Sequence, residues 1–238
     1  MVNASSARRR AALAHYEEVA SLGKALASPV RLRLIDLLRQ GSRSVEELAE
    51  ATGESVANVS RHLQHMRGAR IVDAEREGRH VRYRLAGEVV SRAFAVLRGL
   101  AEDLLPGMDR LGRELGVLEA AEREALLARI LGGQVTLLDV RPAEEYRQRH
   151  LTGARSIPLP ELPARLAEVP RDREVVAYCR GPYCSMAADA VDVLRAAGYR
   201  ARALDFGVPD LRARGFPTET DAPAPDRDVP ATHRRRTR

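Results

Sequence analysis

The chain has 238 residues, 45% of them hydrophobic, and a net charge of +6, which suits two packed domains and excludes wholesale disorder. No run approaches the roughly 18 apolar residues that a membrane helix requires, and the arginine-rich start lacks the apolar core of a signal peptide. The two cysteines, Cys179 and Cys184, lie close together and leave the rest of the chain without thiols, so the chain has no disulfide framework. These features predict a cytoplasmic protein without a membrane partner, which keeps its thiols for chemistry.

The positive charge is concentrated in one short segment. Residues 55–84 hold seven arginines against Asp73, Glu75 and Glu77, a net charge of +4. An excess this local indicates a surface that meets phosphate groups.

Capping residues and breaks divide the first half of the chain into short helices followed by a hairpin. Ser28 before Pro29 suits a helix start, and Ser44 with Glu47 forms a capping box. The expected elements are helices over 8–27, 29–40, 44–51, 55–66 and 88–108, and strands over 71–76 and 80–85 that alternate with the period of a half-buried hairpin.

Two of these helices, joined by a tight turn at 52–53 and followed by a basic hairpin, make a helix-turn-helix with a wing. One face of the second helix is apolar, with Val56, Val59, Leu63 and Met66 turned to the core. The opposite face can pair with base edges of double-stranded operator DNA, and the hairpin arginines suit phosphates. The predicted DNA-binding residues are Ser55, Ala57, Asn58, Ser60, Arg61, Gln64, Arg76, Arg79 and Arg82.

Residues 15–105 resemble the ArsR family of winged-helix regulators. The segments that carry the resemblance are 28–32 (SPVRL), 47–49 (ELA), 59–63 (VSRHL) and 78–83 (GRHVRY). The resemblance implies a homodimer built through the first and last helices, which reads a two-fold symmetric operator. Many family members sense a metal, but here residues 44–48 carry no thiol and the last helix carries no histidine, so no metal site is expected.

The pattern changes after Gly132-Gly133. Short apolar runs over 135–140, 174–179 and 202–206 alternate with helical stretches, including 119–131 and 185–197. This alternation indicates a parallel α/β sheet.

Cys179 ends one of these strands, and a short loop leads from it to a helix at Ser185. Inward-pointing backbone N–H groups and the positive end of the helix favour a thiolate over a thiol, and the thiolate is the nucleophile. Arg180 adds positive charge near the loop. Cys184 has two interpretations, either a thiol that resolves a persulfide on Cys179 into a disulfide, or a small apolar residue buried at the helix start.

Residues 135–217 resemble a single rhodanese domain. The segments that carry the resemblance are 138–142 (LDVRP), 144–146 (EEY), 150–154 (HLTGA), 156–158 (SIP) and 178–181 (YCRG). It implies that Cys179 carries sulfur as a persulfide taken from a donor such as thiosulfate or a persulfide, while Asp139, Arg141 and His150 hold the fold. Related phosphatases need an arginine where this chain has Ser185, so phosphoryl chemistry is disfavoured.

The sequence therefore predicts a winged helix-turn-helix domain followed by an α/β rhodanese domain with a parallel sheet. The expected boundaries are 1–110 for the DNA-binding and dimerisation domain, 111–134 for a helical linker, 135–220 for the rhodanese domain and 221–238 for a disordered tail.

The expected function is a transcription repressor that senses sulfane sulfur, or another thiol-reactive species, through a site of Cys179, Arg180 and Cys184. No cofactor is expected apart from a cysteine persulfide. Two alternatives remain, a working sulfurtransferase tethered to the DNA-binding domain and an inert rhodanese fold that serves only for contact.

Overall fold

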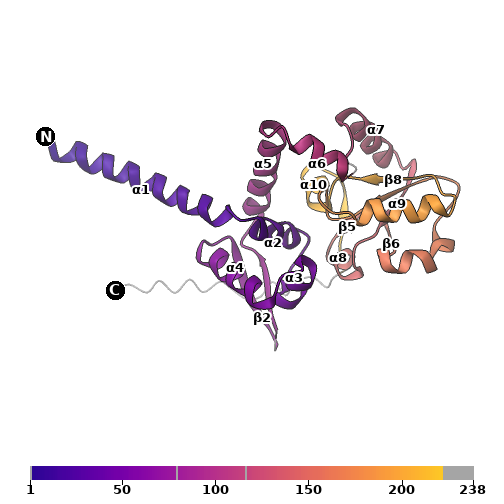
Figure 1. Ribbon diagram of the computed structural model, residues 1–238, viewed down its shortest axis with the longest axis horizontal. Helices are drawn as coiled ribbons and strands as arrows, with labels where there is room; N and C mark the ends of the chain where they lie inside the picture. The colour runs from indigo at the N-terminus through magenta and orange to yellow at the C-terminus, as the bar shows by residue number, and fades with distance from the viewer. Residues whose placement is uncertain (1, 79, 116, 222–238) are drawn as a thin grey trace.

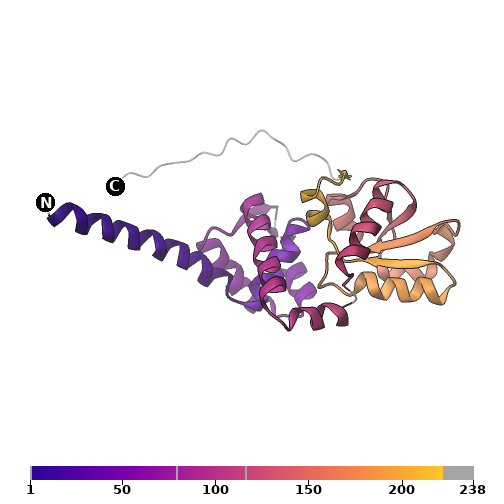
Figure 2. The ribbon, with the colours of Figure 1, turned by 90° about the horizontal axis from the view of Figure 1, so that it is seen from above.

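The computed structural model describes residues 2–78, 80–115 and 117–221. Arg79 of the hairpin tip and residues 222–238 of the expected tail lie outside this range. Two domains lie side by side, joined by two helices along one edge, and a long first helix projects away from both (Figures 1 and 2). Within the described part of the chain, no helix is long and apolar enough to cross a membrane.

The first domain follows the predicted order of helices and hairpin. Its elements are α1 (Val2–Leu26), α2 (Pro29–Arg39), β1 (Arg43–Ser44), α3 (Val45–Thr52), α4 (Val56–Gly68), β2 (Val72–Glu77), β3 (His80–Leu85) and α5 (Glu88–Leu104). The three strands form an antiparallel sheet in the order β1-β3-β2. A further helix, α6 (Met108–Glu114), leads toward the second domain.

Local capping sets the helix-turn-helix. The Ser28 hydroxyl accepts from the backbone N–H of Arg31, and Ser44 and Glu47 form the predicted capping box. Gly53 ends α3 with a φ of 70°, a left-handed conformation that suits glycine. The helix boundaries around the turn are thus fixed by short-range hydrogen bonds, which is why the sequence predicts them well.

The core of this domain is formed by the expected apolar faces, with one exception. Leu34, Leu48, Val59 and Leu63 are fully buried. Val56, predicted to share the buried face of α4, is 46% exposed. Val56 is the first residue of α4, and the buried side chains of this helix begin one turn later, at Val59.

Two helices of this domain leave apolar side chains uncovered. The expected helix over 88–108 ends at Leu104, because Pro106 disfavours the helical conformation of the residue before it. The exposed apolar side chains are Leu13, Tyr16, Val19 and Leu22 on α1 and Val89, Val96, Leu97, Leu100 and Leu104 on α5. A single copy of the chain therefore presents two apolar helix faces to solvent.

The second domain contains the predicted parallel sheet. Its strands are β4 (Val135–Asp139), β6 (Arg155–Ser156), β7 (Glu174–Tyr178) and β8 (Ala201–Leu204), all parallel, in the order β6-β4-β7-β8. A small antiparallel pair, β5 (His150–Leu151) with β9 (Thr218–Glu219), lies beside it. The helical elements are α7 (Ala120–Leu131), α8 (Ala143–Gln148), η1 (Leu159–Ala164), η2 (Leu166–Glu168), α9 (Met186–Ala196) and α10 (Val208–Ala213). The sheet is covered on one face by α9 and η1 and on the other by α7 and α10.

Helix α7 falls within the segment 111–134 that the sequence suggested as a linker. Its Leu126, Leu127 and Ile130 are buried in the same cluster as Val176 and Phe206 of the second domain. The helix is amphipathic, and its apolar face has the sheet to pack against, so it belongs to the core of that domain.

If α7 is part of this core, Leu127→Ala should lower the free energy of unfolding of the second domain by about 2–5 kcal/mol. The matched control is Leu131→Ala on the same helix, where the side chain is 63% exposed. Hydrogen exchange of the β7 amides measures the effect, and equal protection in the two variants would make α7 a linker.

Candidate functional site

Helix α4 presents a polar face to solvent. Ser55, Ala57, Arg61 and Gln64 are exposed, whereas Asn58 and Ser60 are half-buried. Ser55 uses its hydroxyl to accept from the backbone N–H of Asn58 at 3.2 Å and so caps the helix. The exposed face lies on the helix that follows the turn, the position from which such a helix enters a groove.

A chain of side-chain hydrogen bonds orients two of the predicted base-contacting residues. Asn58 Nδ2 donates to Glu54 Oε2 at 2.7 Å, and Arg61 Nη2 donates to Asn58 Oδ1 at 3.0 Å. Arg61 and Asn58 therefore lie together on the polar face of α4, and the hydrogen bond to Asn58 orients the Arg61 guanidinium.

The hairpin arginines differ in how far they are engaged by the fold. Arg76 is exposed, and its Nε donates to the Gly78 carbonyl at 3.3 Å. Arg82 donates to the Ser42 carbonyl at 2.6 Å and is ion-paired with Glu47 at 3.6 Å. These contacts join Arg82 of β3 to the segment before β1 and to α3, so its side chain holds the wing against the helices. Arg79 lies outside the described residues.

The two cysteines come together in the loop that follows β7. Cys179 is only 1% exposed, whereas Cys184 is half-buried. The loop is closed by the backbone N–H of Cys184, which donates to the Gly181 carbonyl at 3.1 Å. The Cys179 thiol donates to the carbonyl oxygen of Cys184 at 3.3 Å. Helix α9 starts directly after the loop, so its positive end faces the pair.

The structure favours Cys184 as the thiolate of this pair, in contrast to the expectation for Cys179. A hydrogen bond from the Cys179 thiol to the Cys184 sulfur, distinct from its contact with the Cys184 carbonyl, acts together with backbone groups of Met186 and Arg180 and lowers the pKa of Cys184 to about 6. The neighbouring Cys184 sulfur and burial raise the pKa of Cys179. Two adjacent sulfurs cannot both ionise easily, so the pair favours a single thiolate, on the less buried Cys184.

Arg180 of the loop is held by a buried carboxylate, and its charge also contributes to the lowered pKa of Cys184. Its guanidinium donates to Glu145 Oε1 at 2.6 Å, and the same carboxylate is bound by Arg43 Nη2 of the first domain at 2.7 Å. Burial alone raises the pKa of Glu145, but the hydrogen bond from Arg180 and the charge of Arg43 hold it below its ordinary value. The loop is thus tied through one buried carboxylate to the start of β1.

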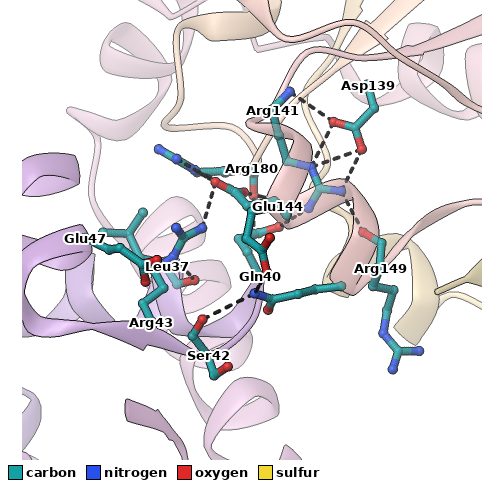
Figure 3. A network of polar contacts seen from close by, with 12 residues as sticks. Leu37, Gln40, Ser42, Arg43, Glu47, Asp139, Arg141, Glu144, Arg149 and Arg180 are labelled. Carbon is teal, nitrogen blue, oxygen red and sulfur yellow. Dashed lines mark hydrogen bonds and ion pairs between the residues drawn. The ribbon is translucent and has the colours of Figure 1, made fainter. Parts of the chain in front are cut away.

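A second tie joins the loop backbone to the end of α2 (Figure 3). Gln40, 4% exposed, donates from Nε2 to the Arg180 carbonyl at 3.0 Å, and its Oε1 accepts from Arg141 Nη1 at 3.1 Å. Arg141 is fully buried and bound to Asp139 at 2.6 Å. Asp139 and Arg141 therefore contact the first domain through Gln40, which in turn holds the Arg180 carbonyl of the loop.

A third contact between the domains involves an acidic residue on α10. Asp210 binds Arg39 Nη2 of α2 at 2.5 Å and Arg98 Nη2 of α5 at 3.2 Å. Burial raises the pKa of Asp210, yet the two guanidinium groups keep it below its ordinary value. Gly207, just before α10, packs so closely on the Arg180 carbonyl that a side chain would collide with it.

His150 has a structural environment. It is 2% exposed, its Nδ1 lies 2.9 Å from the Tyr146 carbonyl, and its ring stacks on Tyr146 with centroids 3.7 Å apart. Among the described residues, no group of three or more histidine, cysteine, aspartate or glutamate side chains could hold a metal ion.

Sequence reasoning missed the residues that join the domains, namely Arg39, Gln40, Arg43, Glu145 and Asp210. Each is an ordinary polar residue in its own segment. Only the contact between two segments more than 100 residues apart gives it a role.

Two family models match this chain. The rhodanese-like domain matches residues 122–213, and the arsR family of bacterial regulatory proteins matches residues 28–74. The chain is 45% identical over 225 residues to the HTH-type transcriptional regulator Rv0324 of Mycobacterium tuberculosis, covering 92% of this chain and 97% of that protein.

Shorter similarities fall on the first domain. The chain is 43% identical over 79 residues to the HTH-type transcriptional regulator CmtR of Mycobacterium bovis, which is 33% of this chain and 67% of that one. A solved fragment from Mycobacterium bovis, the homodimeric winged helix-turn-helix DNA-binding domain of Mb0332, is 45% identical. It covers 41% of this chain and 88% of its own, with a TM-score of 0.38.

The lowered pKa of Cys184 gives a prediction for alkylation by iodoacetamide. The rate at Cys184 should rise as the pH passes about 6 and level off near neutrality, whereas an ordinary thiol titrates near about 8.5. Cys179→Ala removes the donor and should shift this rise to higher pH, while Cys179→Ser keeps a hydroxyl donor and should largely preserve it. Peptide mass spectrometry measures the rates, and identical profiles in all three proteins would contradict the assignment.

Proposed function

Because this chain belongs to the ArsR family of bacterial regulatory proteins and carries a rhodanese-like domain after its winged helix, we propose that it is a repressor switched by sulfur. A sulfane-sulfur donor modifies the Cys179–Cys184 pair, and the modified loop changes the affinity of α4 for operator DNA.

The observation that carries this proposal is the hydrogen bond from Gln40 to the Arg180 carbonyl. Gln40 is the C-cap residue that directly follows α2, and Leu34 and Leu38 of α2 share a core with Val59 and Leu63 of α4. A change in the loop backbone next to Cys179 therefore acts on the helix that supports the recognition helix. This route is direct and does not need the long connection through α5 to α7.

The chemistry needs only the donor and the two thiols. A cysteine thiolate attacks the outer sulfur of thiosulfate, an S–S bond forms on the protein, and sulfite leaves with the electron pair. The second cysteine, as its thiolate, can then attack the inner sulfur of the protein persulfide, which gives a disulfide and releases hydrosulfide. Sulfur loading followed by resolution is therefore balanced without another oxidant.

A second candidate function is a working sulfurtransferase. It is favoured by the match of residues 122–213 to the rhodanese-like domain, with Cys179 directly after β7 at the start of the loop. A transferase passes sulfur to an acceptor repeatedly, whereas a sensor needs to load only once. Steady turnover of thiosulfate and cyanide that does not alter DNA binding would favour the enzyme.

We further propose that the regulator binds DNA as a homodimer through the apolar faces of α1 and α5. Val19→Glu on α1, where the side chain is 67% exposed, should yield monomers and weaken operator binding, because a buried carboxylate opposes association. Sedimentation velocity measures the change. The control is Val56→Glu, also exposed but on α4, which should leave the mass unchanged; a dimeric Val19→Glu protein would remove α1 from the interface.

Arg61 should read a base rather than a phosphate. Arg61→Ala is expected to weaken specific binding by about 1–3 kcal/mol and to relax selectivity at one base position. Arg76→Ala should instead weaken binding to all sequences alike and flatten its salt dependence. Titrations on operator and random DNA at two salt concentrations separate the two. Equal losses on both DNAs for Arg61→Ala would contradict its assignment.

Cys179 should be required for the switch. Operator affinity of the wild type is expected to fall at least about tenfold on treatment with thiosulfate or a persulfide, in the range of ordinary allosteric couplings. Cys179→Ser should keep one affinity with and without donor. The control is Ser185→Ala, which leaves both thiols in place. A Cys179→Ser protein that responds like the wild type would leave the sensor proposal without support.

A further inference from the structure

A cavity of about 570 Å³ lies between the two domains, next to the thiol loop. One wall comes from the first domain and its connection, with Leu32 and Leu37 of α2, Phe94, Leu97 and Ala101 of α5, and Met108 of α6. The other wall is the loop itself, with Tyr183, Cys184 and Met186. Its size is that of an ordinary small-molecule site.

Only one of the two thiols faces this cavity. Cys184 lines it, whereas Cys179 is not among its lining residues and is 1% exposed. A reagent in the cavity therefore meets Cys184 first. Cys184 is also the sulfur whose pKa is lowered, by hydrogen bonds from the Cys179 thiol and from backbone groups, so the negative charge of the pair is favoured on the half-buried sulfur that lines the cavity.

The charged groups around the cavity are largely committed to other partners. Arg98 is bound to Asp210 at 3.2 Å, Arg180 to Glu145 at 2.6 Å, and Asp36 to Arg39 at 3.2 Å. The remaining charged lining residue, Arg33, is exposed. The walls consequently offer apolar side chains and no cluster of cations that would replace the hydration of a dianion.

We propose that this interdomain cavity binds an organic persulfide with an apolar substituent, and that sulfur enters the protein at Cys184. The inference rests on the proposed sensing function and specifies its donor and its point of entry. Thiosulfate, as a small dianion, is the poorer match to such walls.

The transfer is balanced. The Cys184 thiolate attacks the terminal sulfur of the donor, a Cys184 S–S bond forms, and the S–S bond of the donor breaks. The donor leaves as its thiolate and takes up a proton from water. Cys179, whose thiol already donates to the Cys184 carbonyl at 3.3 Å, then attacks the inner sulfur as its thiolate, forming the disulfide and releasing hydrosulfide.

The apolar substituent would lie against α2 and α5 during this reaction. Leu37 of the cavity belongs to the same buried cluster as Val59 and Leu63 of α4. Donor binding and sulfur loading therefore both act on α2, the helix whose C-terminal end Gln40 joins to the loop.

The test compares benzyl persulfide with the hydrophilic glutathione persulfide and with thiosulfate, on the full chain, by rapid quench and peptide mass spectrometry. Benzyl persulfide should react at least about tenfold faster than the other two, as expected for occupation of an apolar pocket. The first modified residue should be Cys184. In Cys184→Ser, loading of Cys179 by benzyl persulfide should be correspondingly slow.

Two cavity variants supply the second arm. Ala101→Phe fills the cavity, and Met108→Gln on α6, at a half-buried lining residue, makes its wall polar without a change in the core. Both should slow benzyl persulfide and leave glutathione persulfide unchanged. The matched control is Ala125→Phe on the exposed side of α7, which should alter neither rate.

The outcomes separate this inference from the proposed function. Equal rates for the three donors, cavity variants that leave the rate for benzyl persulfide unchanged, or first modification at Cys179 would each overturn the cavity assignment. If operator affinity still changed with donor, the sensing function would stand. If sulfur loaded through the cavity as described but operator affinity never changed, the sensing function would fall and the cavity would remain a donor site.

Discussion

The buried amide of Gln40 is the contact on which the arrangement of this molecule depends. It joins three groups that belong to different parts of the chain, the end of α2, the carbonyl of Arg180 in the thiol loop, and the guanidinium of Arg141. Gln40 is almost fully enclosed, so loss of these bonds would leave buried polar groups unpaired at about 1–3 kcal/mol each. The loop and α2 therefore have few ways to move independently.

The charges around this amide are divided between the domains. Arg39, Arg43 and Arg98 come from the first domain, and the carboxylates of Glu145 and Asp210 come from the second. A polar interface of this kind is more easily rearranged than an apolar one, because water and alternative partners can satisfy its groups once they separate. The half-buried Cys184 lies beside these ion pairs, so a chemical change at the thiol is a local event at the interface of the two domains.

Local features of this fold can be read from the sequence, and contacts between distant segments cannot. The caps at Ser28, Ser44 and Ser55 are short-range hydrogen bonds, so residue identity and spacing suffice to place them. Leu97 and Cys184, by contrast, share a cavity only because the two domains meet. The position of the thiolate cannot be read from the sequence either. Cys184 has the lower pKa because Cys179 is more deeply buried and because hydrogen bonds within the loop stabilise the Cys184 thiolate.

The central claim is that Gln40 couples the loop to the DNA-binding helices, and operator affinity measured by fluorescence anisotropy with and without donor tests it most directly. Gln40→Met keeps the size of the side chain and removes both hydrogen bonds, and Gln134→Met, at an exposed position of the second domain, is the matched control. Gln40→Met should still load sulfur on its cysteines but bind operator with one affinity, while the control responds to donor as the wild type does. A Gln40→Met protein that loads sulfur and responds like the wild type would contradict the account.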